Sequence, residues 1–281
     1  MNTSKKTPFF LYSDTTQRSQ PDELDAVKAI FGEENVSYRL TDIQKNHIVI
    51  PRFRAIPFGK ELEAEVTNMG ASLINSYREH RSIADMWNWV NPLADAGLTA
   101  PAYRASEVNT HNLPENEWFV KGETNSIKNR WFECCYAPTT KDLPTIINNN
   151  RNDTYVGTQE IIIRPFQHYR KIGTAVDNRP VFNERRCFVL GNELISYADY
   201  WASLPEFKTA ALDESQFQKT IDTAIRITSE MGLAPFRVID VAEYPDGSWQ
   251  VVELNDGVMS GLSENKPDIV WSAVANYIKN I

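Results

Sequence analysis

The sequence has few of the residues that build disulfide frameworks, zinc sites or membrane spans. Only three of its 281 residues are cysteines, and two of these are adjacent, which is not the pattern of a disulfide-stapled secreted domain. The four histidines lie far apart and no Cys-x-x-Cys motif occurs, so a zinc site is not expected. No apolar run approaches the roughly 20 residues that a membrane-spanning helix needs, and the N-terminal apolar segment is too short for a secretory signal. These absences predict a cytoplasmic protein.

Basic residues are outnumbered by acidic ones, 29 to 37, for a net charge of −8. This balance argues against a large nucleic-acid footprint, although it leaves room for a local basic pocket that holds phosphates. The chain is 42% hydrophobic and 23% charged, a composition typical of a soluble globular protein. Its length is enough to bury a sizeable core in one large domain or in two to three smaller ones.

The first fifty residues alternate strand and helix signals. Short apolar runs at residues 8–12, 36–40 and 47–53 predict strands, and a helical pattern begins at Pro21 and ends at Gly32. This order predicts a small α/β lobe. No glycine-rich loop follows the first strand, so the fingerprint of a Rossmann dinucleotide site is missing.

Residues 60–89 are expected to be mostly helical. Apolar residues recur there at helical spacing, and residues 68–70 mark a break. A second helix is predicted to start at a capping box formed by Ser82 and Asp85. The tryptophans at its end are expected to pack in the core.

A hairpin near the C-terminal end carries three oxygen-bearing side chains. Two apolar strands, Phe236–Ala242 and Trp249–Leu254, flank a Tyr-Pro-Asp-Gly turn. Asp240 lies within the first strand, while Glu253 and Asn255 are two residues apart and share one face of the second. The hairpin can bring the three together, and three oxygen ligands suit Mg²⁺, which commonly binds nucleotide phosphates as well. An edge strand with solvated acids explains the spacing equally well.

Basic residues in the middle of the chain are candidates for phosphate contacts. A strand at residues 118–120 delivers Lys121, and a small polar loop with Lys128 follows. A lysine that leaves an apolar strand beside backbone donors is a common phosphate-binding arrangement. A lysine that merely ends its strand at the surface would give the same pattern. Residues 131–136, with the adjacent cysteines, are expected to form the returning strand.

Two further strands are predicted before the hairpin. Residues 158–166 are the most β-prone run of the chain, and Pro165 interrupts it, leaving backbone groups free of the kind that an adenine edge needs. In the strand at residues 181–190, Glu184 and Arg186 share a face. Arg186 is therefore expected to meet either an anion or the Glu184 carboxylate.

Taken in order, these segments resemble the ATP-grasp superfamily. The order is a lysine after a strand, an interrupted β-rich strand, an arginine-bearing strand, a long helix at residues 213–231, and the acidic hairpin. The segments ERRCFVLGNELIS and VVELNDGVMSGLSE look most similar to a poorly characterised bacterial and phage clade of the superfamily. That clade is distantly similar to ribosomal-protein glutamate ligases and to the cell-division-cycle protein 123 family.

The resemblance implies an α+β protein with the ATP-grasp fold, in which two α+β lobes grip ATP. Residues 101–156 would be the first of these lobes and residues 157–281 the second, with the metal site. Residues 1–100 would form the small α/β lobe that precedes them. The cofactors implied are ATP and Mg²⁺.

The resemblance also implies roles at matching positions. Asp240, Glu253 and Asn255 would bind the metal, Lys121 would contact the nucleotide phosphates, and Arg186 would face the γ-phosphate or an acyl phosphate. The other residues expected to hold the nucleotide are Lys128, Glu160, Ile163, Arg164 and Phe166. The loop after Lys121 lacks the several glycines usual in the superfamily. Arg-Pro-Phe also replaces the usual Gln-Glu-aromatic hinge, so either Glu160 or Arg164 could take the key hinge position.

Three functions fit these expectations. The first is an ATP-dependent ligase that joins a carboxylate to an amine through an acyl phosphate, acting on small molecules, peptides or a protein. The lack of a Ser-His or Cys-His arrangement agrees, because such a ligase needs no nucleophile of its own. The second is an ATP-binding assembly factor acting on a protein partner, which exposure of Trp87, Trp89 and Trp201 would favour. The third is a kinase that phosphorylates a hydroxyl group.

Overall fold

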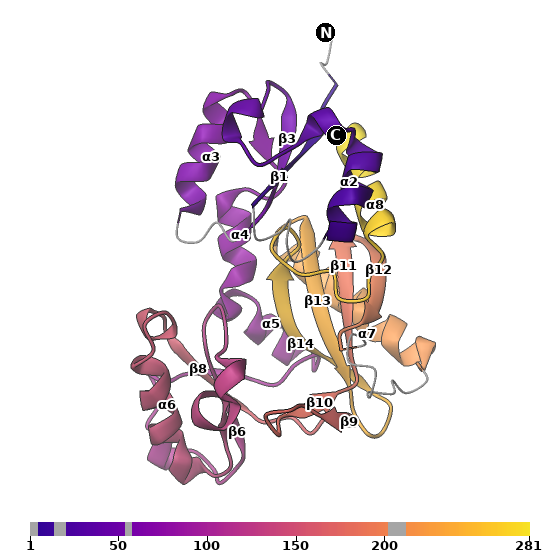
Figure 1. The fold of residues 1–281 in the computed structure, drawn as a ribbon. Helices are drawn as coiled ribbons and strands as arrows, with labels where there is room; N and C mark the ends of the chain where they lie inside the picture. Colours follow the sequence, from indigo (N-terminus) through magenta and orange to yellow (C-terminus); the bar gives the residue numbers. More distant parts are fainter. Residues whose placement is uncertain (1–4, 14–20, 54–57, 202–211) are drawn as a thin grey trace.

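The computed structural model describes residues 5–13, 21–53, 58–201 and 212–281. In these ranges the chain forms three four-stranded sheets and a two-stranded hairpin, arranged along the long axis of the molecule (Figure 1). Among the helices of the described ranges, none combines the length and apolar character needed to cross a bilayer.

The N-terminal part is a parallel sheet with strand order β2-β1-β3-β4. Its elements are β1 (Thr7–Tyr12), α2 (Pro21–Phe31), β2 (Val36–Ser37), β3 (His47–Arg52), α3 (Gly59–Asn68), β4 (Ser72–Leu73), α4 (Tyr77–Ala84) and α5 (Val90–Asp95). Alternate residues of β1 enter two cores: Phe10 packs with residues of α2, and Phe9 with residues of α3. Both faces are therefore covered, as parallel sheets require, and the pattern is that of the expected α/β lobe.

The helices after β3 differ in detail from the expectation. The break falls at the predicted place, where Gly70 has a φ of +75°. The next helix, α4, begins earlier than expected, because the Ser76 hydroxyl accepts from Glu79 N at 3.2 Å while the Glu79 carboxylate accepts from Ser76 N at 2.7 Å. The capping box expected at Ser82 and Asp85 is wrong. Asp85 instead caps a short 3-10 turn at Met86–Asn88.

The last helix of the chain completes the core of the first lobe. α8 (Pro267–Lys279) lies beside α2 (Figure 1), and its Trp271 packs edge-on against Phe10, with ring centroids 5.2 Å apart. The Trp271 indole N–H donates to Glu23 Oε1 at 3.1 Å, and the same oxygen accepts from Arg52 Nε at 2.8 Å. A buried carboxylate thus joins the first and last parts of the sequence.

The middle part is an antiparallel sheet with strand order β5-β8-β6-β7. Its elements are β5 (Tyr103–Arg104), β6 (Trp118–Gly122), β7 (Tyr136–Ala137), α6 (Leu143–Arg151) and β8 (Ile161–Pro165). The strand expected at residues 131–136 is largely wrong, because Trp131–Cys135 forms a π-helical turn and only β7 follows it. The buried residues of the turn are Trp131, Cys134 and Cys135, which have helical and not alternating spacing.

The C-terminal part is an antiparallel sheet with strand order β12-β11-β13-β14. The hairpin β9 (Lys171–Thr174) and β10 (Pro180–Phe182) leads into it, and its elements are β11 (Glu184–Leu190), β12 (Glu193–Asp199), α7 (Glu214–Glu230), β13 (Phe236–Glu243) and β14 (Trp249–Asp256). Cys187 and Ile239 pack with α7, whereas their neighbours Phe188 and Val238 pack with α8. By the same alternation Asp240 lies on the α8 side of the sheet.

Arg237 fastens α7 to the other face of this sheet. It is 1% exposed, and it donates to Thr228 Oγ1 at 3.1 Å, Ser229 Oγ at 2.8 Å and Gly191 O at 2.9 Å. Within the described residues no carboxylate pairs with it. Burial accordingly lowers the pKa of Arg237 to about 10, and the negative end of the α7 dipole supports its charge.

Replacing Arg237 should destabilise the protein strongly, because the substitution leaves several buried acceptors without a donor. We expect Arg237→Ala to lower the free energy of unfolding by about 3 kcal/mol, measured by urea denaturation. The control is Arg226→Ala on the same helix, where an exposed pair with Glu230 is lost and the change should stay within about 0.5 kcal/mol. Equal effects of the two variants would contradict this account.

Candidate functional site

The end of the β13–β14 hairpin brings together the three side chains expected to bind metal. Asp240 pairs with Glu253 across the ladder, and Asn255 Nδ2 lies 3.5 Å from Asp240 Oδ2. The register shifts between Asp240 and Val241, which places one extra residue, Val252, in β14. Without this bulge Val252 would stand opposite Asp240, and Glu253 would point to the other face of the sheet.

Arg186 on β11 neutralises Asp240. Its Nε and Nη2 donate to Asp240 Oδ1 and Oδ2 at 2.9 and 2.8 Å, and its Nη1 donates to Gly261 O at 2.8 Å. Burial alone would lower the pKa of Arg186, but Asp240 raises it above its ordinary value. The expected pairing of Arg186 with Glu184 is wrong, because Asp240 lies directly opposite on β13.

Lys121 crosses from the middle sheet to the C-terminal sheet. Its Nζ lies 2.8 Å from Glu253 Oε1, and its side chain is only 4% exposed. The interpretation of Lys121 as a strand-ending surface lysine is therefore wrong. Burial lowers the pKa of the nearby Lys128, but Glu253 and, more weakly, Tyr200 and Glu184 outweigh it, so the pKa lies above its ordinary value. Both lysines carry positive charge at neutral pH.

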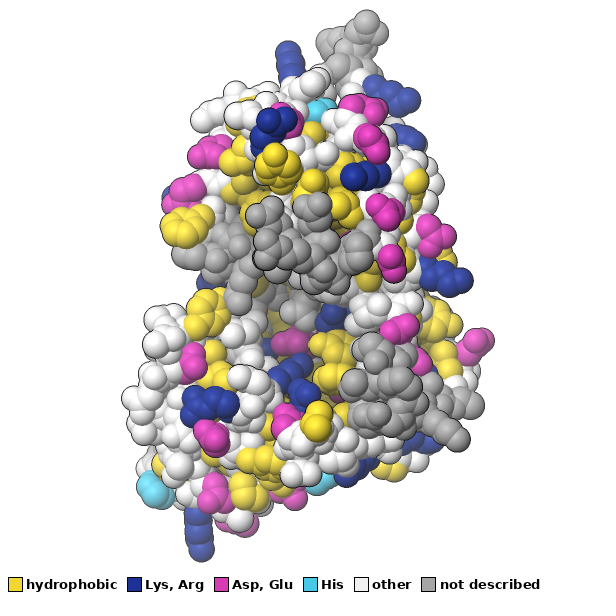
Figure 2. Space-filling model, viewed as in Figure 1, with side chains coloured by type: hydrophobic (Ala, Val, Ile, Leu, Met, Phe, Trp, Pro, Cys, Tyr) yellow, Lys and Arg dark blue, Asp and Glu magenta, His cyan; other side chains and the backbone are white. Residues whose placement is uncertain are grey.

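Two cavities meet at these charges. The larger has a volume of about 410 Å³, within the range of small-ligand sites. Its polar lining includes Lys128, Arg186, Tyr200, Glu253, Asn255 and residues 124–126. The second cavity, of about 100 Å³, is lined by the rings of Phe119, Trp131, Phe166, Tyr169 and Phe182. Both cavities include Ser126, Lys128 and Glu253 in their walls. Figure 2 shows the hollow, where basic and acidic side chains gather between the upper and lower parts of the molecule.

The end of β8 reaches the aromatic cavity, but its beginning does not. Arg164 and Phe166 line this cavity. Glu160 instead accepts from Ser106 Oγ at 2.7 Å and lines neither cavity. Ile163 is a fully buried core residue paired to strands on both sides. The structure thus removes Glu160 and Ile163 from the expected nucleotide-binding set, because only the last residues of the strand face the opening.

Arg164 has a supporting contact as well. Its Nη1 donates to Val252 O at 3.2 Å, and its Nη2 donates to Thr99 Oγ1 at 2.6 Å and to Ala100 O at 3.0 Å. Burial lowers the pKa of Arg164. The arginine therefore satisfies the carbonyl of the bulge residue while its side chain lines the aromatic cavity.

A comparison with known families decides the assignment of the chain. The sequence model of an ATP-grasp domain family, the third family of its clade, matches residues 110–274, more than half of the chain. The chain belongs to this ATP-grasp family. The expected α+β ATP-grasp fold is thereby confirmed. Among curated proteins, no significant match to this ATP-grasp protein was found.

Solved structures share the ATP-grasp fold over nearly the whole chain. The D-cycloserine synthetase DcsG has a TM-score of 0.62 and 12% identity, with 96% of this chain and 99% of that one covered. A RimK domain ATP-grasp protein from Sphaerobacter thermophilus has a TM-score of 0.61 and 13% identity, with 96% and 98% covered. The ATP-grasp ligase PsnB, complexed with minimal precursor, Mg and ADP, has a TM-score of 0.57 and 14% identity, with 98% of each chain covered. At these identities the likeness concerns the fold.

The loop after Lys121 in this ATP-grasp protein is held by a glutamine. Gln159 Oε1 accepts from Thr124 N at 3.1 Å, and Gln159 Nε2 donates to Asn125 Oδ1 at 2.8 Å. A Cβ atom on Gly122 would lie 2.6 Å from Gln159 Oε1, so this position requires glycine. One glycine and a side-chain clamp therefore do the work for which other ATP-grasp loops use several glycines.

Three residues of the two cavities were not assigned a role from the sequence. Glu184 and Tyr200 had a signal, since both lie on or beside the arginine-bearing strand. His80 had none, because it comes from α4 and reaches the site only through the tertiary fold. Burial raises the pKa of Glu184 from its ordinary 4.5 to about 7.

The raised pKa of Glu184 predicts a pH-dependent stability. A carboxyl whose folded pKa exceeds its unfolded value stabilises the fold at low pH and loses this contribution as pH rises through about 7. The wild-type free energy of unfolding should fall by about 1–3 kcal/mol from this group between about pH 5 and pH 8. Glu184→Gln should lack that fall in urea titrations, whereas the exposed control Glu193→Gln should keep it. An unchanged slope in Glu184→Gln would refute the prediction.

Proposed function

We propose that this ATP-grasp protein is an ATP- and Mg²⁺-dependent ligase, which activates a carboxylate as an acyl phosphate and joins it to an amine. One observation carries the proposal. Lys121, Lys128 and Arg186 converge on the oxygen-bearing end of the β13–β14 hairpin, where an aromatic cavity opens into a larger polar one. Cations around hard oxygen donors are what a metal–triphosphate complex needs.

The hairpin end has a donor set that fits Mg²⁺. Asp240 and Glu253 offer carboxylate oxygens and Asn255 an amide oxygen, all hard ligands. Burial raises the pKa of Glu253, but Lys121 and Lys128 outweigh it and hold the pKa well below its ordinary range, so this carboxylate is ionised at neutral pH. Among the residues that the structure describes, no three His, Cys, Asp or Glu side chains form a metal cluster, so the Asn255 amide is needed to complete the set.

The two cavities suit the two ends of a nucleotide. The aromatic cavity offers flat faces such as those of Trp131 and Phe166, on which an adenine can pack. The triphosphate would run past Lys128, which both cavities share, toward Arg186. The remainder of the larger cavity is then free for the carboxylate and amine substrates.

The chain's own groups act by position and charge. A donor carboxylate attacks the γ-phosphorus of ATP while Lys121, Lys128 and Arg186 offset the negative charge of the transferring group. Bound Mg²⁺ supplies further positive charge at the phosphate oxygens. An amine then attacks the acyl carbon, and inorganic phosphate leaves. The structures that share this fold include one named as a synthetase and one named as a ligase, which supports this reaction class.

The assembly-factor alternative loses the feature that would have favoured it. Trp89 is 1% exposed, Trp87 packs against the core and lies 4.3 Å from the Arg104 guanidinium, and Trp201 is partly buried beside Arg179. None of these three tryptophans is an exposed docking residue. The kinase alternative differs in its product, a phosphorylated hydroxyl group.

Glu253→Gln should abolish Mg²⁺-dependent ATP binding, because it removes a carboxylate from the metal set and the partner of Lys121. Isothermal titration with ATP, with and without Mg²⁺, measures the effect. We expect affinity to fall by at least about tenfold, the lower end of what loss of a metal-site contact costs, with an unchanged circular dichroism spectrum. The exposed control Glu230→Gln should bind as wild type does. Wild-type binding by Glu253→Gln would refute the metal assignment.

The proposed reaction is tested by trapping the acyl phosphate. The protein is incubated with ATP, Mg²⁺, hydroxylamine and each of the common amino acids, and ADP and hydroxamate are measured. We expect equal amounts of both products with at least one donor. Arg186→Lys keeps the charge but not the bidentate contact, and should reduce kcat by about 100-fold with little change in the KM for ATP. ADP with a phosphorylated hydroxyl would indicate a kinase, and tight ATP binding without turnover an assembly factor.

A further inference from the structure

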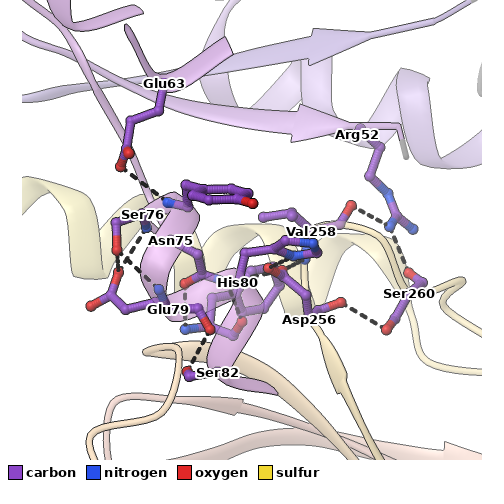
Figure 3. A network of polar contacts seen from close by, with 12 residues as sticks. Arg52, Glu63, Asn75, Ser76, Glu79, His80, Ser82, Asp256, Val258 and Ser260 are labelled. Carbon is purple, nitrogen blue, oxygen red and sulfur yellow. Dashed lines mark hydrogen bonds and ion pairs between the residues drawn. The ribbon is translucent and has the colours of Figure 1, made fainter. Parts of the chain in front are cut away.

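His80 brings an unpartnered ring nitrogen to the wall of the larger cavity. Its Nδ1 lies 2.8 Å from Asp256 Oδ2, as Figure 3 shows. Its Nε2 is buried and has no hydrogen-bond partner among the described residues, and the whole residue is 5% exposed. The ring lines the same cavity as Glu253 and Asn255.

The surroundings of Asp256 fix the tautomer of His80. The other carboxylate oxygen, Oδ1, accepts from Asn75 Nδ2 at 2.9 Å and from Val258 N at 2.8 Å. An ionised carboxylate can only accept hydrogen bonds, so the His80 nitrogen that faces it must be the N–H. A neutral imidazole has one N–H. Nε2 therefore carries a lone pair and is free to take a proton.

A purely structural role explains only half of this arrangement. Asn75 already fastens the N-terminal lobe to β13, because its amide accepts from Phe236 N at 3.0 Å and donates to Phe236 O at 2.6 Å. Arg52 makes a second link by donating to Val258 O and Ser260 O at 2.9 and 2.6 Å. A buried polar atom without a partner costs stability, and docking of the lobe gives no reason for leaving Nε2 unpaired.

The position of His80 suits the second step of the proposed ligation. Asp256 directly follows Asn255 in β14, so the imidazole lies beside the expected metal set. His80 also lines a smaller, mostly apolar cavity formed with Leu62, Leu73 and Val258. Met259 lines both cavities, and a methionine side chain rearranges easily.

We infer that His80 accepts the proton that the acceptor amine loses, with Asp256 holding the ring in place; this rests on the ligase function proposed above. The neutral amine nitrogen attacks the acyl carbon, the C–N bond forms, and the C–O bond to phosphate breaks with its electron pair leaving on the phosphate. The proton passes from the amine nitrogen to Nε2. The resulting imidazolium is stabilised by the Asp256 carboxylate and returns its proton to phosphate or water. The amine reaches Nε2 when the Met259 side chain moves aside.

The first test is spectroscopic and needs no substrate. The full chain is labelled with ¹⁵N-histidine, and the His80 signals are assigned by their loss in His80→Gln. We expect a neutral ring at pH 7.5 with the proton on Nδ1. The groups that face the ring or share its cavity are Asp256, Lys128, Arg186, Tyr200 and Glu253. A proton on Nε2, in either the neutral or the charged ring, would overturn the inference.

The second test separates the two half-reactions. Hydroxylamine is already unprotonated at neutral pH and needs little help from a base, whereas an amino acid acceptor must lose a proton. His80→Gln should reduce amide formation by about 100-fold or more, the usual contribution of a general base, yet keep hydroxamate formation within about threefold of wild type. Added imidazole should partly restore amide formation to His80→Ala. The control is His111→Gln, on an exposed loop, which should act as wild type in both assays.

The failures of the two proposals are distinguishable. If wild type forms no hydroxamate with any donor, the ligase function fails, and the inference that rests on it fails as well. If wild type forms hydroxamate but His80→Gln loses both products equally, or neither, the ligase function stands and the role of His80 in proton transfer is overturned.

Discussion

Charge balance in a space that water scarcely reaches is the constraint on which the site depends. Asp240 would be prohibitively costly on the buried face of its sheet without the two hydrogen bonds from Arg186. Glu253 is balanced in the same way by Lys121 from the neighbouring sheet. Buried ion pairs add little net stability compared with apolar packing. Their presence is accounted for by the proposed function, because a metal–triphosphate complex would meet both signs of charge already fixed in place.

The order of motifs along the sequence predicted most of what lies close together. Alternating apolar residues fixed the strands β11, β13 and β14, and the period of two placed Asp240 on one face. The arrival of Lys121 from another sheet could be expected only through the resemblance to ATP-grasp proteins, since no local rule brings residues 132 positions apart into contact. The three α+β units expected at residues 1–100, 101–156 and 157–281 remain a proposal about domain boundaries.

What could not be predicted depends on single residues whose effect is not local. The bulge at Val252 decides which side of the sheet Glu253 faces, and no pattern in the strand marks it, because its carbonyl is satisfied by Arg164 from a different sheet. The turn at residues 131–135 reads as a strand by composition, yet tertiary burial selects helical spacing. His80 gives no signal at all, because its partner Asp256 lies 176 positions away.

The placement of α8 has a consequence for how the chain is made. Trp271 and Glu23, 248 positions apart, share a hydrogen bond in the core of the first lobe. A ribosome releases the N-terminal strands long before the helix that covers them, so during synthesis this apolar surface must wait uncovered. Closing so large a loop is slow. The nascent chain is thus a natural client for chaperones until its last helix emerges.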